Sequence, residues 1–107
     1  MVGGLSPVPE GLRAARVEID AIDDAMVDLL VRRLKVVEKV VAIKAEAGIP
    51  ALLPDRVEEV VERVCARARA MGLPEDLPET LWREIIAWTI RYENAHLPDT
   101  GAPGASS

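Results

Sequence analysis

Apolar residues recur every three or four positions along most of the chain, which is the spacing that gathers them on one face of an α-helix. In the first such stretch, Pro9 and Glu10 suit a first helical turn, and no residue breaks the pattern before Gly48 and Pro50. We therefore predict a long first helix over about residues 10 to 46. Its apolar stripe consists of Ile19, Ile22, Met26, Leu29, Leu30, Val37, Val40 and Val41.

Two shorter helices are predicted after the first. One covers about residues 54 to 71, because a proline is tolerated in a first helical turn and Gly72 can adopt the left-handed conformation that ends a helix. The other starts after Asp76 and Pro78 and continues to about Leu97. Ala, Val, Leu and Ile dominate the composition and Phe is absent, which favours helices packed on helices. The predicted fold class is all-α.

The length of the chain, 107 residues, allows one modest core and therefore one domain, which we place at residues 9–97. Residues 1–8 and 98–107 are rich in Gly, Pro and Ser with little to bury, so both are predicted to be disordered tails. A helix over residues 10 to 46 would be roughly 55 Å long, whereas a compact chain of this size has a radius of gyration of about 13 Å. We therefore expect a second chain to lie beside the first helix.

Charge and cysteine content narrow the classes of function. The net charge is −5 and the basic residues are interleaved with acids, which argues against nucleic-acid binding. A single cysteine, Cys65, and a single histidine, His96, indicate no disulfide within the chain and no metal cluster, so no metal is expected. No apolar run approaches the roughly 20 residues of a bilayer span, and the N-terminus lacks a signal-peptide pattern. We expect no membrane partner and a cytoplasmic location.

Charged side chains interrupt the apolar stripes. Arg33 and Lys44 fall inside the stripe of the first helix, eleven residues apart, so both point the same way about 16 Å apart along the axis. Arg16 lies roughly 100° around the same helix, so unless the helix bends it reaches the same pocket only from a partner chain. In the third helix, Glu93 lies one turn beyond Thr89, within a stripe that also holds Trp82, Ile85 and Ile86. A carboxylic acid therefore also faces the core.

These charges allow two interpretations. In one, Glu93 forms a buried ion pair with Arg33 or Lys44, or the long cations extend outward to solvent. In the other, Arg33 and Lys44, joined by Arg16 and Arg56, outnumber the inward carboxylate, and a bound anion supplies the missing negative charge. The two-pronged donors of arginine suit carboxylates, so a small dicarboxylate is the expected ligand. No nucleophile paired with a base accompanies the cations, which leaves catalysis by orientation and by donors aimed at developing negative charge.

Three segments together resemble the all-helical (type II) class of chorismate mutases: "RVEIDAIDDAMVDLLVRRLKVVEKVVAIKAEAGIP", "PDRV" and "LWREIIAWTIRYEN". They span almost everything from Arg13 to Leu97. The resemblance implies an intertwined homodimer of three-helix chains and a cofactor-free [3,3] rearrangement of chorismate to prephenate. The four cations of the family match Arg16, Arg33, Lys44 and Arg56.

By the same resemblance, Arg33 and the partner subunit's Arg16 bind the two carboxylates of the substrate. Lys44 donates to the ether oxygen, where negative charge grows as the C–O bond breaks, and Arg56 supports a carboxylate and closes the site. Glu93 stands where many members have glutamine, the second donor to the ether oxygen. A glutamate donates only when it is protonated; burial favours that form and nearby cations oppose it, so the resemblance leaves its state open.

Two positions differ from the better-studied chorismate mutases and leave the substrate open. Leu53 and Val57 are apolar where those enzymes have an acid near the substrate's 4-hydroxyl and a glutamate. The apolar loop "GIPALLPDRV" is closer to isochorismate-pyruvate lyase and to 4-amino-4-deoxychorismate mutase, and in the latter a glutamate also occurs at the position of Glu93. Thr89 and Val57 are candidates for tuning substrate choice. The non-enzyme alternative is a helical dimerisation or ligand-sensing module.

Overall fold

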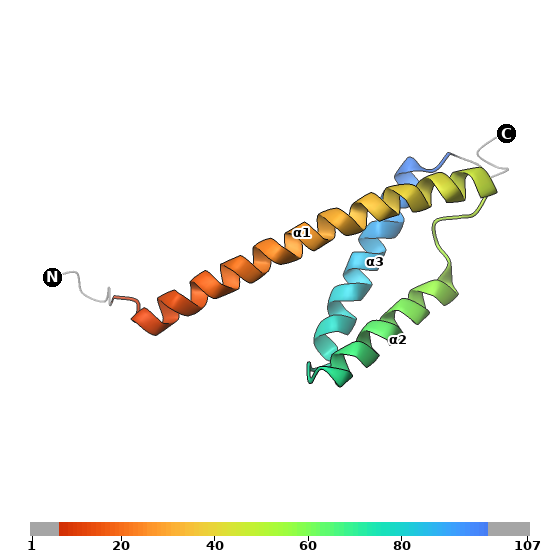
Figure 1. Ribbon diagram of the computed structural model, residues 1–107. Helices are drawn as coiled ribbons and strands as arrows, with labels where there is room; N and C mark the ends of the chain where they lie inside the picture. Colours follow the sequence, from red (N-terminus) through yellow and green to blue (C-terminus); the bar gives the residue numbers. More distant parts are fainter. Residues whose placement is uncertain (1–6, 99–107) are drawn as a thin grey trace. The chain divides into compact units, whose positions relative to one another are not determined.

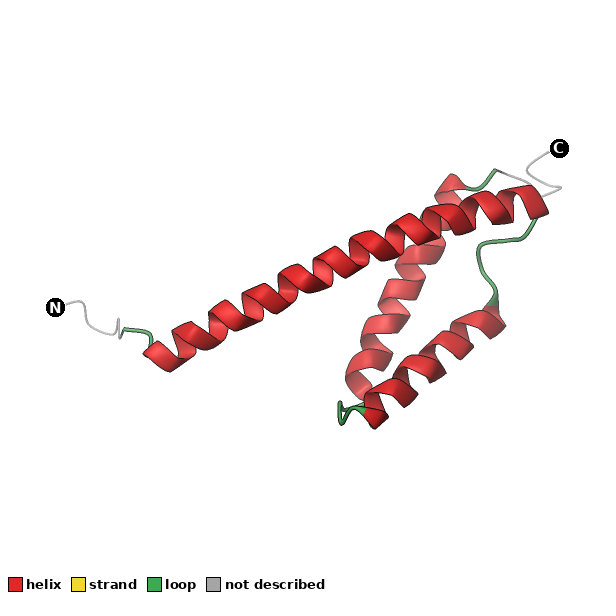
Figure 2. Cartoon of the chain, in the orientation of Figure 1, coloured by secondary structure: helices red, strands yellow, loops and turns green. Residues whose placement is uncertain are grey.

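The computed structural model describes residues 7–98 of the chain, and within that range it contains three helices and no strand (Figures 1 and 2). Helix α1 covers Glu10–Ala47, α2 covers Pro54–Ala70 and α3 covers Asp76–His96. The all-α prediction and its three helices are confirmed. The predicted disordered tails, residues 1–8 and 98–107, lie outside the described residues except for residues 7, 8 and 98.

The ends of the helices agree with the predicted ends to within one residue, apart from the start of α3. We expected this helix to begin after Pro78, but it begins at Asp76 and Pro78 lies buried in its first turn. A proline is accommodated there because the first N–H groups of a helix have no intrahelical acceptor, so the missing N–H costs nothing.

Helix α2 ends in a backbone motif that requires glycine. Gly72 has a φ of 76°, a left-handed conformation that a side chain disfavours. The N–H of Leu73 then donates to the carbonyl of Ala68 at 2.8 Å, and the N–H of Gly72 donates to that of Arg69 at 3.1 Å. These two bonds satisfy carbonyl groups that the end of the helix leaves without partners, and the chain turns back toward α3.

The described part of the chain forms two compact units, which divide between residues 35 and 36 inside α1. Helix α1 has 38 residues, all of them described, and Val37 alone is buried. Within residues 10–35 the exposed large apolar side chains are Leu12, Val17, Ile19, Ile22, Met26, Val27, Leu29, Leu30 and Val31. Leu12, Ile19, Ile22, Met26, Leu29 and Leu30 of this set share one face at helical spacing, and such a face is stabilised when another helix covers it. The homodimer stays a prediction that this exposed face supports.

Helices α2 and α3 lie side by side in the second unit and bury a small core between them (Figure 1). The core consists of Val61, Cys65 and Ile86, with the partly buried Val57, Val60, Trp82 and Ile90 packed against it. Burying a side chain such as Ile86 stabilises the fold by about 1.5–3 kcal/mol. Cys65 is a free thiol within this core, which agrees with a packing role for the one cysteine of the chain.

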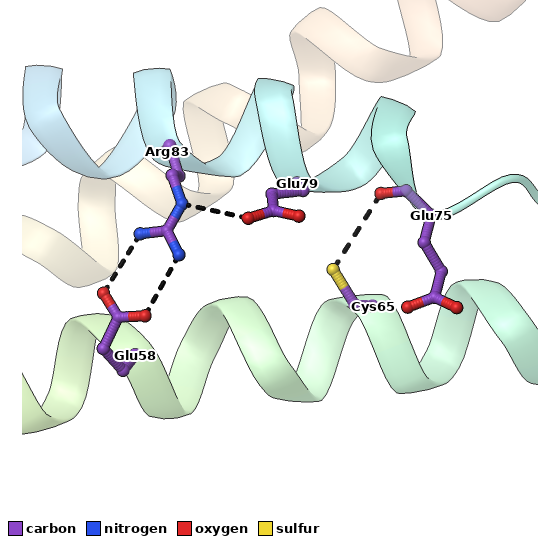
Figure 3. A network of polar contacts seen from close by, with 5 residues as sticks. All are labelled: Glu58, Cys65, Glu75, Glu79 and Arg83. Carbon is purple, nitrogen blue, oxygen red and sulfur yellow. Dashed lines mark hydrogen bonds and ion pairs between the residues drawn. The ribbon is translucent and has the colours of Figure 1, made fainter.

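Arg83, an exposed residue of α3, connects α3 to α2 at their surface (Figure 3). The Nη1 and Nη2 atoms of Arg83 on α3 each donate to a carboxylate oxygen of Glu58 on α2 at 3.0 Å, and its Nε donates to Glu79 at 3.3 Å. The paired hydrogen bonds and the charge of Arg83 lower the pKa of Glu58, and the two carboxylates raise the pKa of Arg83. This two-pronged contact links the exposed surfaces of α2 and α3.

None of the helices in the described part of the chain combines the length and the apolarity needed to cross a bilayer.

We expect Glu58→Gln to lower the thermal midpoint of unfolding slightly at neutral pH and to have no effect in strong acid. The folded-state pKa of Glu58 lies below its ordinary value of 4.5, so its carboxylate stabilises the fold fully above that value. The contribution is lost as the pH falls through the lowered folded-state pKa. The effect is small because both side chains are exposed to solvent.

Thermal melts followed by circular dichroism across this pH range measure the difference. Glu62→Gln serves as the matched control, because Glu62 is an exposed glutamate on α2 that has no ion pair within residues 7–98. Equal shifts in both variants, or a Glu58→Gln shift that does not depend on pH, would contradict the assignment.

Candidate functional site

A buried ion pair joins the end of α1 to the end of α3. The Nζ of Lys44 donates to Oε1 of Glu93 at 2.8 Å, and the two side chains are 13% and 8% exposed. The same Nζ also donates to the backbone carbonyl of Ala51 at 2.9 Å. These three residues belong to the second unit of the chain, so one ammonium group ties two helices and the loop between α1 and α2.

The local sequence brings the loop back to Lys44. Gly48 has a φ of 70°, and the N–H of Ile49 donates to the carbonyl of Lys44 at 2.9 Å, which ends α1 in a tight turn. The loop that follows places Ala51 in a buried position, with 5% of its surface exposed. Lys44 is therefore bound to the loop twice, through its backbone carbonyl and through its ammonium.

The loop ends where α2 begins. Leu53 precedes the helix in an extended conformation and Pro54 takes a first-turn position. The carbonyl of Leu53 accepts from the N–H groups of Arg56 and Val57 at 3.0 and 3.1 Å. Residues 48–53 are thus fixed by backbone hydrogen bonds at both ends.

Helix α3 supplies the acid of the pair from a buried face. Thr89 and Glu93, one turn apart, are both buried although they are polar. The hydroxyl of Thr89 donates to the carbonyl of Ile85 at 2.7 Å. The side chain of Glu93 instead points its carboxylate at Lys44, so the polar part of this face ends at the ion pair.

For Lys44, the structure shows the ion pair with Glu93 that the first interpretation of the charges included. Its side chain does not extend outward to solvent; it forms the buried ion pair with Glu93. An ammonium has three N–H donors, and within the described residues two of them have acceptors, Glu93 and Ala51. The third is available to an oxygen of a ligand. In a site of low dielectric, a donor held in this way stabilises negative charge more strongly than it would in water.

The other predicted cations lie in different surroundings. Arg56 is exposed at the start of α2, where its Nη1 donates to Oε1 of Glu59 at 2.5 Å. Arg16 and Arg33 belong to the first unit of the chain, where Arg16 is exposed and Arg33 is half-buried. Within the second unit, the structure brings the predicted residues Lys44 and Glu93 into direct contact.

The two predicted apolar residues differ in burial. Leu53 is 37% exposed at the start of α2. Val57 is half-buried and packs against the core between α2 and α3. Val57 thus has a structural role in addition to the role in substrate choice that we expected for it.

Sequence reasoning missed Ala51. The group that contacts Lys44 is a backbone carbonyl, which every residue carries, so the identity of residue 51 contains no signal for it. A partial signal was the glycine at position 48, because a left-handed helix end directs the following residues back along the helix. Within residues 7–98, no group of three or more His, Cys, Asp or Glu side chains is placed to hold a metal ion.

Two comparisons with known proteins cover this region. The sequence profile of the family described as chorismate mutase type II matches residues 15–94, a range that includes both Lys44 and Glu93. A curated relative, the protein named T-protein from Enterobacter agglomerans, is 35% identical over 83 residues, which is 78% of this chain and 22% of the relative. The chain thus spans about a fifth of the length of that relative.

Proposed function

The chain belongs to the chorismate mutase type II family, and from this premise we propose that it rearranges chorismate to prephenate without a cofactor. The observation that carries the proposal is the largely buried side chain of Lys44, whose ammonium is held by Glu93 and Ala51 and has one further N–H donor without an acceptor among residues 7–98. A [3,3] rearrangement needs no acid, base or nucleophile, so catalysis consists of orienting the substrate and stabilising charge on its ether oxygen. The reaction places the protein in aromatic amino acid biosynthesis.

Each predicted residue has a role in this proposal. Arg33 and the partner subunit's Arg16 bind the two carboxylates, and Lys44 donates to the ether oxygen as the C–O bond breaks. Arg56 exchanges its contact with Glu59 for a carboxylate of the substrate when the site closes. The remaining lining residues are Leu53, Val57 and Thr89.

The homodimer is part of the proposal because the site takes Arg16 from the second chain. The exposed apolar residues of α1 within residues 10–35 support it, since a second copy of α1 would cover them. The exposed position of Arg16 also supports it, because within residues 7–98 this side chain has no ion pair. An arginine without an internal partner is available to a neighbouring subunit.

We further propose that Glu93 acts as a neutral acid when the substrate is bound. In the structure its carboxylate accepts from Lys44, and an ionised carboxylate has no proton to donate to the ether oxygen. A dianionic substrate brings negative charge close to Lys44, which disfavours a third carboxylate beside it. Protonation of Glu93 removes that repulsion and supplies a second donor.

One observation favours a second candidate, 4-amino-4-deoxychorismate mutase. The ion pair with Lys44 in the structure calls for an ionised Glu93, and an ionised carboxylate suits a substrate with an amine. The apolar Leu53 and Val57 also leave a 4-hydroxyl without a polar partner from these two positions. Isochorismate-pyruvate lyase, which uses the same dicarboxylate clamp, is the third activity to compare.

The experiment that tests the proposal offers chorismate, isochorismate and 4-amino-4-deoxychorismate in parallel and identifies the product of each. We expect prephenate from chorismate, and we expect Lys44→Ala to lower kcat by about 10²–10³-fold because it removes a donor aimed at developing charge. Lys39→Ala is the control, since Lys39 is an exposed lysine of the same helix. Preferred turnover of another substrate reassigns the activity, and no turnover of any of them favours the dimerisation or ligand-sensing module.

Mixing two inactive variants tests the shared site. Arg16→Ala and Arg33→Ala each disrupt both sites of a homodimer, but a mixed dimer keeps one site with both arginines intact. After co-refolding at equal amounts, about a quarter of the parent activity should return, because half of the dimers are mixed and each restores one of two sites. If both arginines came from the same chain, every site of the mixed dimer would lack one of them and no activity would return.

The pH dependence of the rate tests the state of Glu93. A neutral donor is lost as the acid ionises, so kcat should fall from mildly acidic to alkaline pH. Glu93→Gln, which donates at every pH, should flatten this profile, and Glu62→Gln should leave it unchanged. A parent rate that holds steady or rises with pH would rule out the neutral donor.

A further inference from the structure

We propose that the backbone carbonyl of Ala51 is a positioning group that holds the Lys44 ammonium at the angle the reaction needs. The inference rests on the proposed function. It adds a backbone group to the side chains of the proposed site. Its geometric basis is the 2.9 Å contact from Nζ of Lys44 to this carbonyl, seven positions along the chain.

The loop is built to present this carbonyl. Residues 48–53 are tied at one end by the N–H of Ile49 on the carbonyl of Lys44, and at the other by the carbonyl of Leu53 in the first turn of α2. Between these fixed ends Ala51 is buried, whereas its neighbours Pro50 and Leu52 are exposed. Backbone hydrogen bonds at both ends of the loop therefore set the position of the carbonyl.

The two acceptors of Lys44 differ in charge, and this difference separates their roles. The carboxylate of Glu93 neutralises the ammonium as it binds it. The Ala51 carbonyl is a neutral dipole, so it orients the ammonium and leaves its positive charge available to an anion. When Glu93 is protonated or turns toward the substrate, Ala51 is the acceptor that keeps Lys44 in place.

Through this contact, the position of one loop atom, the carbonyl oxygen of Ala51, affects catalysis. A shift of the loop by a fraction of an ångström moves the Ala51 carbonyl and turns the remaining N–H of Lys44 away from its target. Misplacing a donor in this way lowers the rate of the chemical step more than it weakens binding. Loop residues that never touch the substrate therefore influence kcat.

An amide-to-ester exchange tests the inference without changing any side chain. Replacing Leu52 by its α-hydroxy acid converts the Ala51 carbonyl from an amide to an ester, which is a weaker acceptor. The exchange also removes the N–H of Leu52, which donates to no other group within residues 7–98. We expect kcat to fall about fivefold with a smaller change in KM, because a charge-assisted hydrogen bond is weakened and not abolished.

The same exchange in a Lys44→Ala chain is the matched control. If the carbonyl acts through Lys44, the ester has no further effect once the ammonium is gone, and the two changes are strongly non-additive. Full activity of the ester chain would overturn the inference. An equal loss of activity with and without Lys44 would also overturn it, because the ester would then act on the loop alone. Thermal melts of each chain establish that the folded form is being assayed.

A readout that does not need turnover separates this inference from the proposed function. Side-chain NMR relaxation of Lys44, in protein with labelled lysine, reports how rigidly the ammonium end is held. We expect greater mobility of the Lys44 Cε in the ester chain than in the parent, and unchanged mobility would overturn the inference. If the ester increases the mobility of Lys44 but the parent protein turns over none of the three substrates, the proposed function is refuted. The positioning of Lys44 by the Ala51 carbonyl then still holds.

Discussion

A single ammonium group joins α1, α3 and the loop between α1 and α2 in the second unit of this protein. Lys44 contacts Glu93 on α3 and Ala51 in the loop, and its own backbone carbonyl holds the turn at Ile49. A buried charge must be satisfied by partners, so the burial of Lys44 requires the loop and the end of α3 to lie where they do. Removing one partner of such a pair typically destabilises a fold by about 3–5 kcal/mol, which makes this contact a structural constraint as well as a chemical one.

The α2–α3 core and the Lys44–Glu93 ion pair consist of separate residues. The α2–α3 pair has its own core around Val61 and Ile86, and Arg83 fastens it at the surface. The ion pair of Lys44 and Glu93 lies beyond this core, at the far ends of α1 and α3. The family match spans both regions. The α2–α3 packing orients α3, which carries Glu93, but the ion pair itself lies outside that packing.

Local chemistry explains which parts of the structure the sequence could predict. The ends of α1 and α2 were predictable because Gly48 and Gly72 take left-handed conformations that few other residues adopt. The inward direction of Lys44 and Glu93 followed from helical periodicity, which fixes the face of a residue whatever its neighbours are. The start of α3 was misplaced because Pro78 is equally compatible with the first turn of a helix and with the loop before it.

The partners of the charges were less predictable than their directions. Periodicity placed Arg33, Lys44 and Glu93 on inward faces, but the choice of Lys44 as the partner of Glu93 depends on how the loop and α3 pack. The contact of Arg56 with Glu59 and the acceptor role of the Ala51 carbonyl likewise come from three-dimensional packing. A backbone acceptor has no residue-type signature, so no reading of the sequence could have assigned it.

Val57 belongs both to the core between α2 and α3 and to the set of residues expected around the ligand. Leu53, the other apolar residue of that set, is 37% exposed and lies outside this core. A polar replacement at Val57 is therefore expected to lower stability as well as to change the proposed ligand's surroundings, whereas a replacement at Leu53 lies outside the core. We expect substrate specificity in this scaffold to change first by substitution at Leu53 in the loop. Substitution at Val57 in α2 should follow only in proteins whose core is stable enough to tolerate it.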